Sequence, residues 1–113
     1  MKDEYLDYVE DIIKAMNDAL RFVEGMGFEG FEKDRKTVYA VIRALEIIGE
    51  ATKNVPSAVK GRYPDIPWKD MAGMRDKVVH AYFGVDLKRV WSTVTCDIPS
   101  LKPCFEKIFK DEK

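Results

Sequence analysis

The segment DRKTVYAVIRALEIIGEATKN, residues 34–54, decides the fold of this chain. Its apolar side chains recur every three or four residues, the spacing of one face of an α-helix: Val38, Val41, Ile42, Leu45, Ile48 and Ala51. Asp34 is a residue type that caps helix N-termini, and Pro56 ends the segment because proline cannot continue a helix. We therefore expect an amphipathic helix from Asp34 to about Asn54.

Residues 3–25, before this helix, have the same apolar period and predict a first long helix. Three glycines between residues 25 and 30 end it. The segment that follows is expected to be a loop, in which Phe28 and Phe31 pack against the helices. Residues 63–68 contain two prolines and predict a turn, after which a third main helix carries Trp68 and the polar segment from Arg75 to Tyr82, before Gly84 interrupts it.

The last amphipathic stretch follows Asp86, which is a candidate N-cap, and extends to about residue 108. Pro99 and Pro103 lie inside it and predict a kink or a break near Asp97. No segment shows the two-residue alternation of a strand. The chain is therefore predicted to be all-α, a four- to five-helix up-and-down bundle that forms a single domain, residues 1–113.

Composition limits the possible functions of this 113-residue chain. Charged residues make up 35% and hydrophobic ones 46%, which favours a soluble globular protein, and no apolar run has the roughly 20 residues of a membrane span. The start of the chain does not resemble a signal peptide, so a cytoplasmic location is expected. The net charge of −1 argues against non-specific nucleic-acid binding, and Cys96 and Cys104 are expected to be reduced.

The candidate chemistry is concentrated in Arg75-Asp76-Lys77-Val78-Val79-His80-Ala81-Tyr82, which holds the single histidine of the chain. On a helix, Asp76 and His80 stack one turn apart, and Arg75 shares a neighbouring stripe with Tyr82. Arg75 and His80 are separated by about 140° around the helix axis. This angle favours a site shared by two copies of the helix.

These residue types suit cleavage of RNA without a metal. An imidazole with a pKa of about 6.5 can accept the proton of a ribose 2′-hydroxyl, and a guanidinium can stabilise the charge on the phosphorane. Asp76 is placed to orient His80. The alternatives are structural: a histidine near a helix end is often a cap or core residue, an Arg-Asp pair is often a surface ion pair, and Tyr82 fits a core position.

The segment from Arg75 to Tyr82 resembles the Arg-x4-6-His motif of HEPN domains, in the form with a tyrosine two residues after the histidine that marks the HepT toxin family. Residues 41–51 resemble the second helix of that family. Residues 63–68 resemble its loop, and residues 73–75 and 82–86 complete the match. The resemblance covers nearly the whole chain.

The resemblance implies a HEPN-like homodimer that acts as the ribonuclease toxin of a type VII toxin–antitoxin pair. Its implied partners are an RNA substrate and a minimal nucleotidyltransferase antitoxin of the MntA type. Toxin and antitoxin are candidates to assemble into a hetero-oligomer larger than the toxin dimer. Arg75 and His80 carry over as catalytic residues, with Asp76 in support and Tyr82 as the residue that receives AMP. No cofactor and no metal are implied.

Two alternatives to this reading remain open. A catalytically silent helical adaptor would present the same surface to the nucleotidyltransferase, and a plain dimerisation protein would need no catalytic site. Three charged residues share one side of a helix: Arg43, Glu46 and Glu50. They either form ion pairs on a solvated face or support Arg75 or His80. A basic cluster at residues 53–62 either guides RNA or belongs to a charge-balanced surface.

Overall fold

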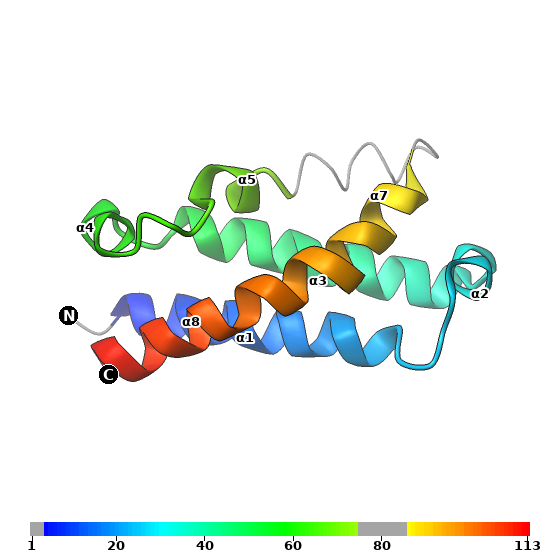
Figure 1. Cartoon of the computed structure of the whole chain (residues 1–113), viewed down its shortest axis with the longest axis horizontal. Helices are drawn as coiled ribbons and strands as arrows, with labels where there is room; N and C mark the ends of the chain where they lie inside the picture. Colours follow the sequence, from blue (N-terminus) through cyan, green and yellow to red (C-terminus); the bar gives the residue numbers. More distant parts are fainter. Residues whose placement is uncertain (1–3, 75–85) are drawn as a thin grey trace.

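The computed structural model describes residues 4–74 and 86–113. Helix α1 (Glu4–Phe22) and helix α3 (Arg35–Lys53) pack against each other along their lengths and run in opposite directions (Figure 1). Both long helices predicted from the sequence are confirmed. Asp34 caps α3, because its carboxylate accepts a 3.1 Å hydrogen bond from the backbone N–H of Thr37.

A third long helical segment crosses α1 and α3 obliquely and consists of α7 (Leu87–Ser92), η1 (Thr93–Asp97) and α8 (Ile98–Glu112) (Figure 1). Asp86 caps it as predicted, accepting a 2.9 Å hydrogen bond from the backbone N–H of Arg89. α8 packs on α1. The described part of the chain thus has a three-helix core of α1, α3 and the α7–α8 segment.

The interruption predicted near Asp97 takes the form of a π-helical turn, η1, and the chain remains helical on both sides of it. Pro99 lies in the first turn of α8 and has no N–H to donate to the carbonyl of Thr95, so the regular α-helical ladder fails there. A π turn hydrogen-bonds residues five apart and accommodates one extra residue. The Thr93 and Thr95 hydroxyls also donate to carbonyls four residues earlier, a contact that perturbs helices.

In the described part of the chain, three short helices lie between the long ones: α2 (Phe28–Lys33), α4 (Ser57–Arg62) and α5 (Trp68–Ala72). The prediction of a loop after the glycines was wrong for residues 28–33, because one helical turn places Phe31 fully inside the core. The packing predicted for Phe28 and Phe31 is confirmed, since both rings lie against Trp91 of α7. No strand occurs in residues 4–74 and 86–113.

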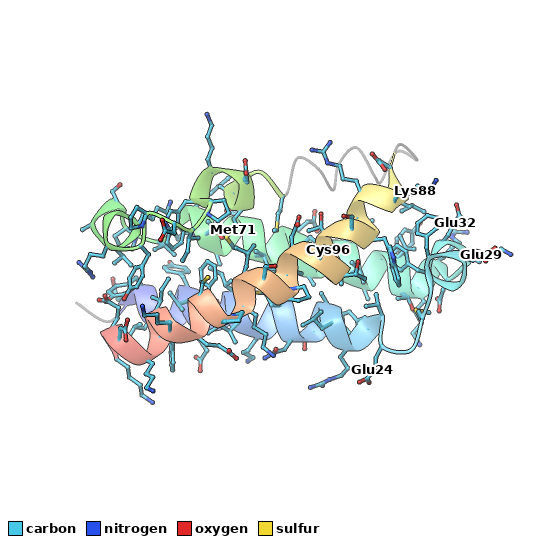
Figure 2. All side chains as sticks on the ribbon, viewed as in Figure 1. Glu24, Glu29, Glu32, Met71, Lys88 and Cys96 are labelled. Atoms are coloured by element: carbon cyan, nitrogen blue, oxygen red, sulfur yellow. The ribbon has the colours of Figure 1, made fainter. Side chains whose placement is uncertain are left out.

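The core is continuous between the three long helices and α5. Its largest fully buried side chains are Phe31, Phe105, Ile12, Met16, Leu45, Ile48, Met71, Ile98 and Ile108. Cys96 and Cys104 are both free thiols, as predicted; Figure 2 shows Cys96 on the α7–α8 segment. No helix of the described residues is both long and apolar enough to cross a membrane.

Candidate functional site

The four residues that the sequence singles out for chemistry, Arg75, Asp76, His80 and Tyr82, lie outside the described residues. The same holds for the third main helix after Met74. The structure shows its start as α5, which ends at Ala72 with Gly73 as its C-cap, so the helix predicted to run on from Trp68 is interrupted there. The roles of these four residues therefore stay predictions. The structure does define how the chain is held on either side of them.

The chain before Arg75 is anchored by aromatic and sulfur-containing side chains. The ring of Trp68 in α5 packs edge-on against Phe105 of α8, with 5.5 Å between ring centroids, and its indole N–H donates a 3.0 Å hydrogen bond to the carbonyl of Tyr63. Met71, labelled in Figure 2, and Met74 are buried in the core. The residue before Arg75 is thus fixed by packing.

The chain after residue 85 is anchored by a second aromatic cluster. Trp91 of α7 lies 6.3 Å from the ring of Phe28 and 5.2 Å from that of Phe31, measured between centroids. The carboxylate of Asp86 caps α7. The start of α7 is therefore held against α2 by aromatic packing and by a satisfied helix end.

Both anchored ends belong to the same side of the molecule. α5 packs directly on α3, and α7 packs on α2, which itself contacts α3. Figure 1 shows α5 and α7 on the same side of α3, toward its two opposite ends. Helix α3 is thus the element beside which the described chain stops at Met74 and resumes at Asp86.

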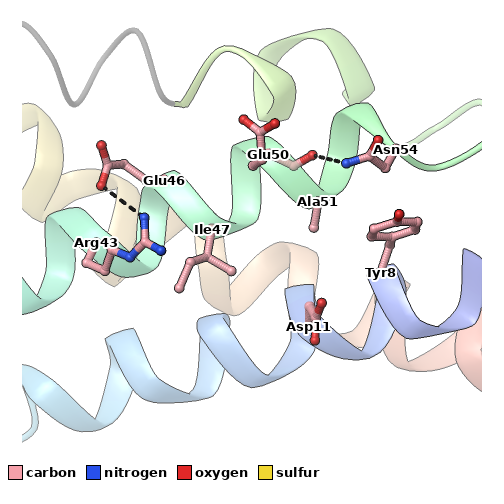
Figure 3. Close-up of a pocket in the computed structure, with 8 residues that line it drawn as sticks. All are labelled: Tyr8, Asp11, Arg43, Glu46, Ile47, Glu50, Ala51 and Asn54. Atoms are coloured by element: carbon pink, nitrogen blue, oxygen red, sulfur yellow. Dashed lines mark hydrogen bonds and ion pairs between the residues drawn. The ribbon is translucent and has the colours of Figure 1, made fainter.

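A polar groove of about 440 Å³ lies between α1 and α3 (Figure 3). Ile47 and Ala51 contribute apolar surface to it, and the remaining lining residues are polar: Tyr8, Asp11, Arg43, Glu46, Glu50 and Asn54. Tyr8 points from α1 toward α3, and Glu50 points toward α5 (Figure 3). The groove therefore collects the three α3 residues that the sequence grouped on one side of that helix.

The groove carries more negative than positive charge. Among the described lining residues there are three carboxylates and one guanidinium, and that guanidinium is 3.6 Å from Glu46, with 72% of the Arg43 side chain exposed. The ion pairing predicted for this face is confirmed for Arg43 and Glu46, and an exposed pair of this kind contributes about 1 kcal/mol or less. A support of Arg75 or His80 by Glu46 or Glu50 stays a prediction.

Sequence analysis missed three lining residues of the groove, namely Tyr8, Asp11 and Asn54. Tyr8 lies outside the apolar stripe of α1 and is 37% exposed. Its position off the stripe could have marked it in the sequence, because a large aromatic side chain on a polar helix face often belongs to a binding surface. Asp11 follows one turn later on α1. Asn54 is the C-cap of α3, and its side-chain amide donates a 3.1 Å hydrogen bond to the Glu50 carbonyl.

The basic residues near the end of α4 are committed to intramolecular contacts. Arg62 donates two hydrogen bonds, of 2.7 and 3.1 Å, to the carboxylate of Glu112 in α8. Lys60 places its ammonium 5.9 Å from the centroid of the Trp68 ring. The structure therefore favours a charge-balanced surface over an RNA-guiding cluster at these two residues.

Glu112 also joins the first and last helices. It accepts a 2.6 Å hydrogen bond from the Tyr5 hydroxyl and one of 3.0 Å from the Tyr63 hydroxyl. The Arg62 guanidinium and these hydroxyls lower the pKa of Glu112 from 4.5 to about 2. Burial and the Glu112 carboxylate raise the pKa of Tyr63 to about 12, so both groups keep their ordinary charge at neutral pH.

Within residues 4–74 and 86–113 no group of three or more His, Cys, Asp or Glu side chains is arranged to hold a metal ion.

Residues 12–108 match the model of a protein family described as HepT-like, ribonuclease HepT-like. The match spans most of the chain: it covers α3 completely, α1 from residue 12 onward, and the α7–α8 segment to residue 108. The all-α fold and this match define the class as a helical ribonuclease. The chain belongs to the HepT-like ribonuclease family and is an enzyme of that class.

Curated relatives agree with this assignment. A protein of Thermococcus cleftensis named "Probable ribonuclease HepT" is 56% identical over 97% of this chain and 100% of its own length. An RNase-named protein of Methanocaldococcus jannaschii is 48% identical over 92% of this chain and 90% of its own. An RNase-named protein of Caldanaerobacter subterraneus is 42% identical over 94% of this chain and 95% of its own length. No solved structure matches the chain.

Proposed function

We propose that this chain is a metal-independent endoribonuclease toxin in which Arg75 and His80 act on RNA at a site between two copies of the chain. Family membership carries the proposal, because it makes the chain a ribonuclease and the Arg-x4-His-x-Tyr motif is where the sequence concentrates its chemistry. Each copy would contribute the whole chain as one helical domain.

The proposed reaction is an internal transfer at phosphorus. His80 removes the proton of a ribose 2′-hydroxyl, the 2′-oxygen bonds to the adjacent phosphorus, and the bond to the 5′-oxygen breaks. The products are a 2′,3′-cyclic phosphate and a 5′-hydroxyl, which takes its proton from an imidazolium or from water. Arg75 stabilises the charge on the phosphorane, and Asp76 orients the imidazole.

A homodimer would supply both the general base and the general acid that the reaction needs. One imidazole cannot be base and acid in the same step, and the chain has a single histidine. Two copies would bring two His80 side chains to one cleft. The fixed ends at Met74 and Asp86, on one side of α3, suit this arrangement because both are held by packing before any partner binds.

Tyr82 is the proposed control point. A minimal nucleotidyltransferase of the MntA type, as the antitoxin, would transfer AMP from ATP to its hydroxyl and release pyrophosphate. The added phosphate and nucleoside would occupy the position needed by RNA phosphate beside Arg75. The toxin would then be silenced by a covalent change at its own active site.

The catalytic proposal is tested with purified protein and RNA in the presence of a chelator. His80→Ala and Arg75→Ala are each expected to lower cleavage about 10²- to 10⁴-fold. Arg89→Ala is the matched control, because Arg89 is an exposed cation of α7. Equal cleavage by all four proteins would remove the assignment.

The modification is tested by intact-mass measurement after incubation with the nucleotidyltransferase and ATP. The wild type is expected to gain one or more AMP units and to lose cleavage, whereas Tyr82→Phe is expected to gain none. An adduct of equal size on Tyr82→Phe would place the acceptor elsewhere.

A further inference from the structure

Among the described residues, the groove between α1 and α3 presents more hydrogen-bond acceptors than donors. Asp11 and Glu46 present carboxylates, which only accept when ionised, and the Asn54 side chain adds an amide oxygen. Glu50 is a further carboxylate that already has an interaction of its own. Arg43, the one cation among the described lining residues, faces Glu46. A phosphate would be repelled by this surface, and a ligand edge that carries N–H donors would be attracted.

Tyr8 and Asp11 are placed to make the first contacts. They are one turn apart on α1, both are exposed, and within the described residues neither has a hydrogen-bond or ion-pair partner. Tyr8 borders the groove with its ring and Asp11 with its carboxylate (Figure 3). A flat aromatic ligand could stack on the first and donate hydrogen bonds to the second.

We infer that this groove binds a base of the RNA substrate and selects guanine, an inference that rests on the proposed function. Guanine carries two adjacent donors, N1–H and the N2 amino group, which match the two oxygens of one carboxylate. Adenine and cytosine place an acceptor nitrogen beside their amino group, and uracil places its N–H between two carbonyls. A carboxylate therefore discriminates for guanine.

The size and position of the groove fit a base of single-stranded RNA. Its volume of about 440 Å³ lies within the range of small-ligand sites, roughly 300–1,000 Å³. Sequence-selective proteins read unpaired RNA bases by stacking on aromatic side chains and by hydrogen bonds to base edges. The groove shares α3 with α5, the helix that precedes Arg75 in the chain.

Binding is tested without catalysis by NMR titration of the full chain with dinucleotides that lack a 2′-hydroxyl. The ligands are dGdT, dIdT and dAdT; the inosine ligand lacks only the N2 amino group of guanine. We expect dGdT to shift the backbone amides of Tyr8, Asp11 and Ala51, and dIdT and dAdT to bind about tenfold more weakly. Absence of these shifts, or equal affinity for dGdT and dAdT, would overturn the inference.

Variants locate the contact. Asp11→Asn replaces one acceptor oxygen by a donor and is expected to weaken dGdT about tenfold or more, whereas Glu10→Gln removes a neighbouring exposed charge outside the groove and is expected to leave affinity unchanged. Tyr8→Leu is expected to weaken all three dinucleotides together, because stacking is insensitive to base identity. Equal loss in Asp11→Asn and Glu10→Gln would show a general charge effect and reject the contact.

A competing occupant is the guanidinium of a partner protein, which also donates in a plane. Titration with N-acetyl-arginine amide decides this, and shifts at the same amides at lower concentration than dGdT needs would assign the groove to a basic polypeptide.

Mapping of cleavage sites separates this inference from the proposed function. Cleavage without guanosine preference, and without dGdT binding, rejects the inference alone, whereas dGdT binding without any cleavage rejects the proposed function alone.

Discussion

Phe105 is the side chain through which α8 supports α5, and its truncation to alanine is expected to destabilise the fold strongly. The ring is fully buried and packs on Trp68 with an interplanar angle of 79°. A buried aromatic side chain removes about 150–250 Å² from water, worth about 4–6 kcal/mol at ~25 cal/mol per Å². Alanine retains part of this, so we expect a loss of about 3–5 kcal/mol, in line with other Phe→Ala truncations.

Urea unfolding followed by circular dichroism measures this loss. A small domain has about 5–15 kcal/mol of stability, so Phe105→Ala should lower the unfolding midpoint markedly with an unchanged slope. Phe22→Ala is the matched control: Phe22 is 40% exposed, and the same truncation there is expected to cost about 1–2 kcal/mol. Equal losses at the two sites would refute the assignment of Phe105 to the core. RNA cleavage by folded Phe105→Ala, measured below its unfolding midpoint, should fall as well, because α5 precedes the proposed catalytic residues in the chain.

Three further predictions concern single sites. The pKa of Glu112 is about 2 in the folded chain against 4.5 for a free carboxyl. The ionised Glu112 therefore stabilises the fold fully above pH 4.5, and this stabilisation is lost as the pH falls toward 2. The difference in Tm between wild type and Glu112→Gln should shrink over that range. Gly25 has a φ of +79°, so Gly25→Ala should cost about 1–2 kcal/mol in urea unfolding, whereas Gly61→Ala, inside a helix, should stabilise by about 0.5–1 kcal/mol. Asp34→Ala should lower the Tm by about 4 °C, measured by calorimetry, because α3 loses its cap, and Asp34→Asn should retain most of it.

The long helices could be predicted because their apolar period, caps and terminators all agree. Asp34 and Asp86 cap helices at the predicted positions, and the helix that follows Asp34 ends before Pro56. The short helix at residues 28–33 could not be predicted, because a single turn has too few residues to show a period. Its formation depends on the burial of Phe31, which is a tertiary effect.

The candidate site shows the same division. Residues 75–82 could be singled out because they collect the one histidine with an arginine and a tyrosine at helical spacings. The groove could not, because Tyr8 and Asp11 are 46 and 43 positions before Asn54, and a contact between two helices leaves no local pattern. Only the α3 side of the groove could be recognised in the sequence, because Glu46 and Glu50 lie four residues apart on one helix face.

The π turn at residues 93–97 keeps α8 in phase with α7 although it contains one residue more than a regular helix would. Five residues of a π turn cover about the rotation that four cover in an α-helix, so removing one residue there should restore an unbroken helix and leave Ile98, Phe105 and Ile108 facing the core. Removing one residue from the regular part of α8 would instead turn every later side chain by about 100°. The π turn is therefore where this helical segment should tolerate a change of length, and its exposed Thr95 and Cys96 should also tolerate substitution.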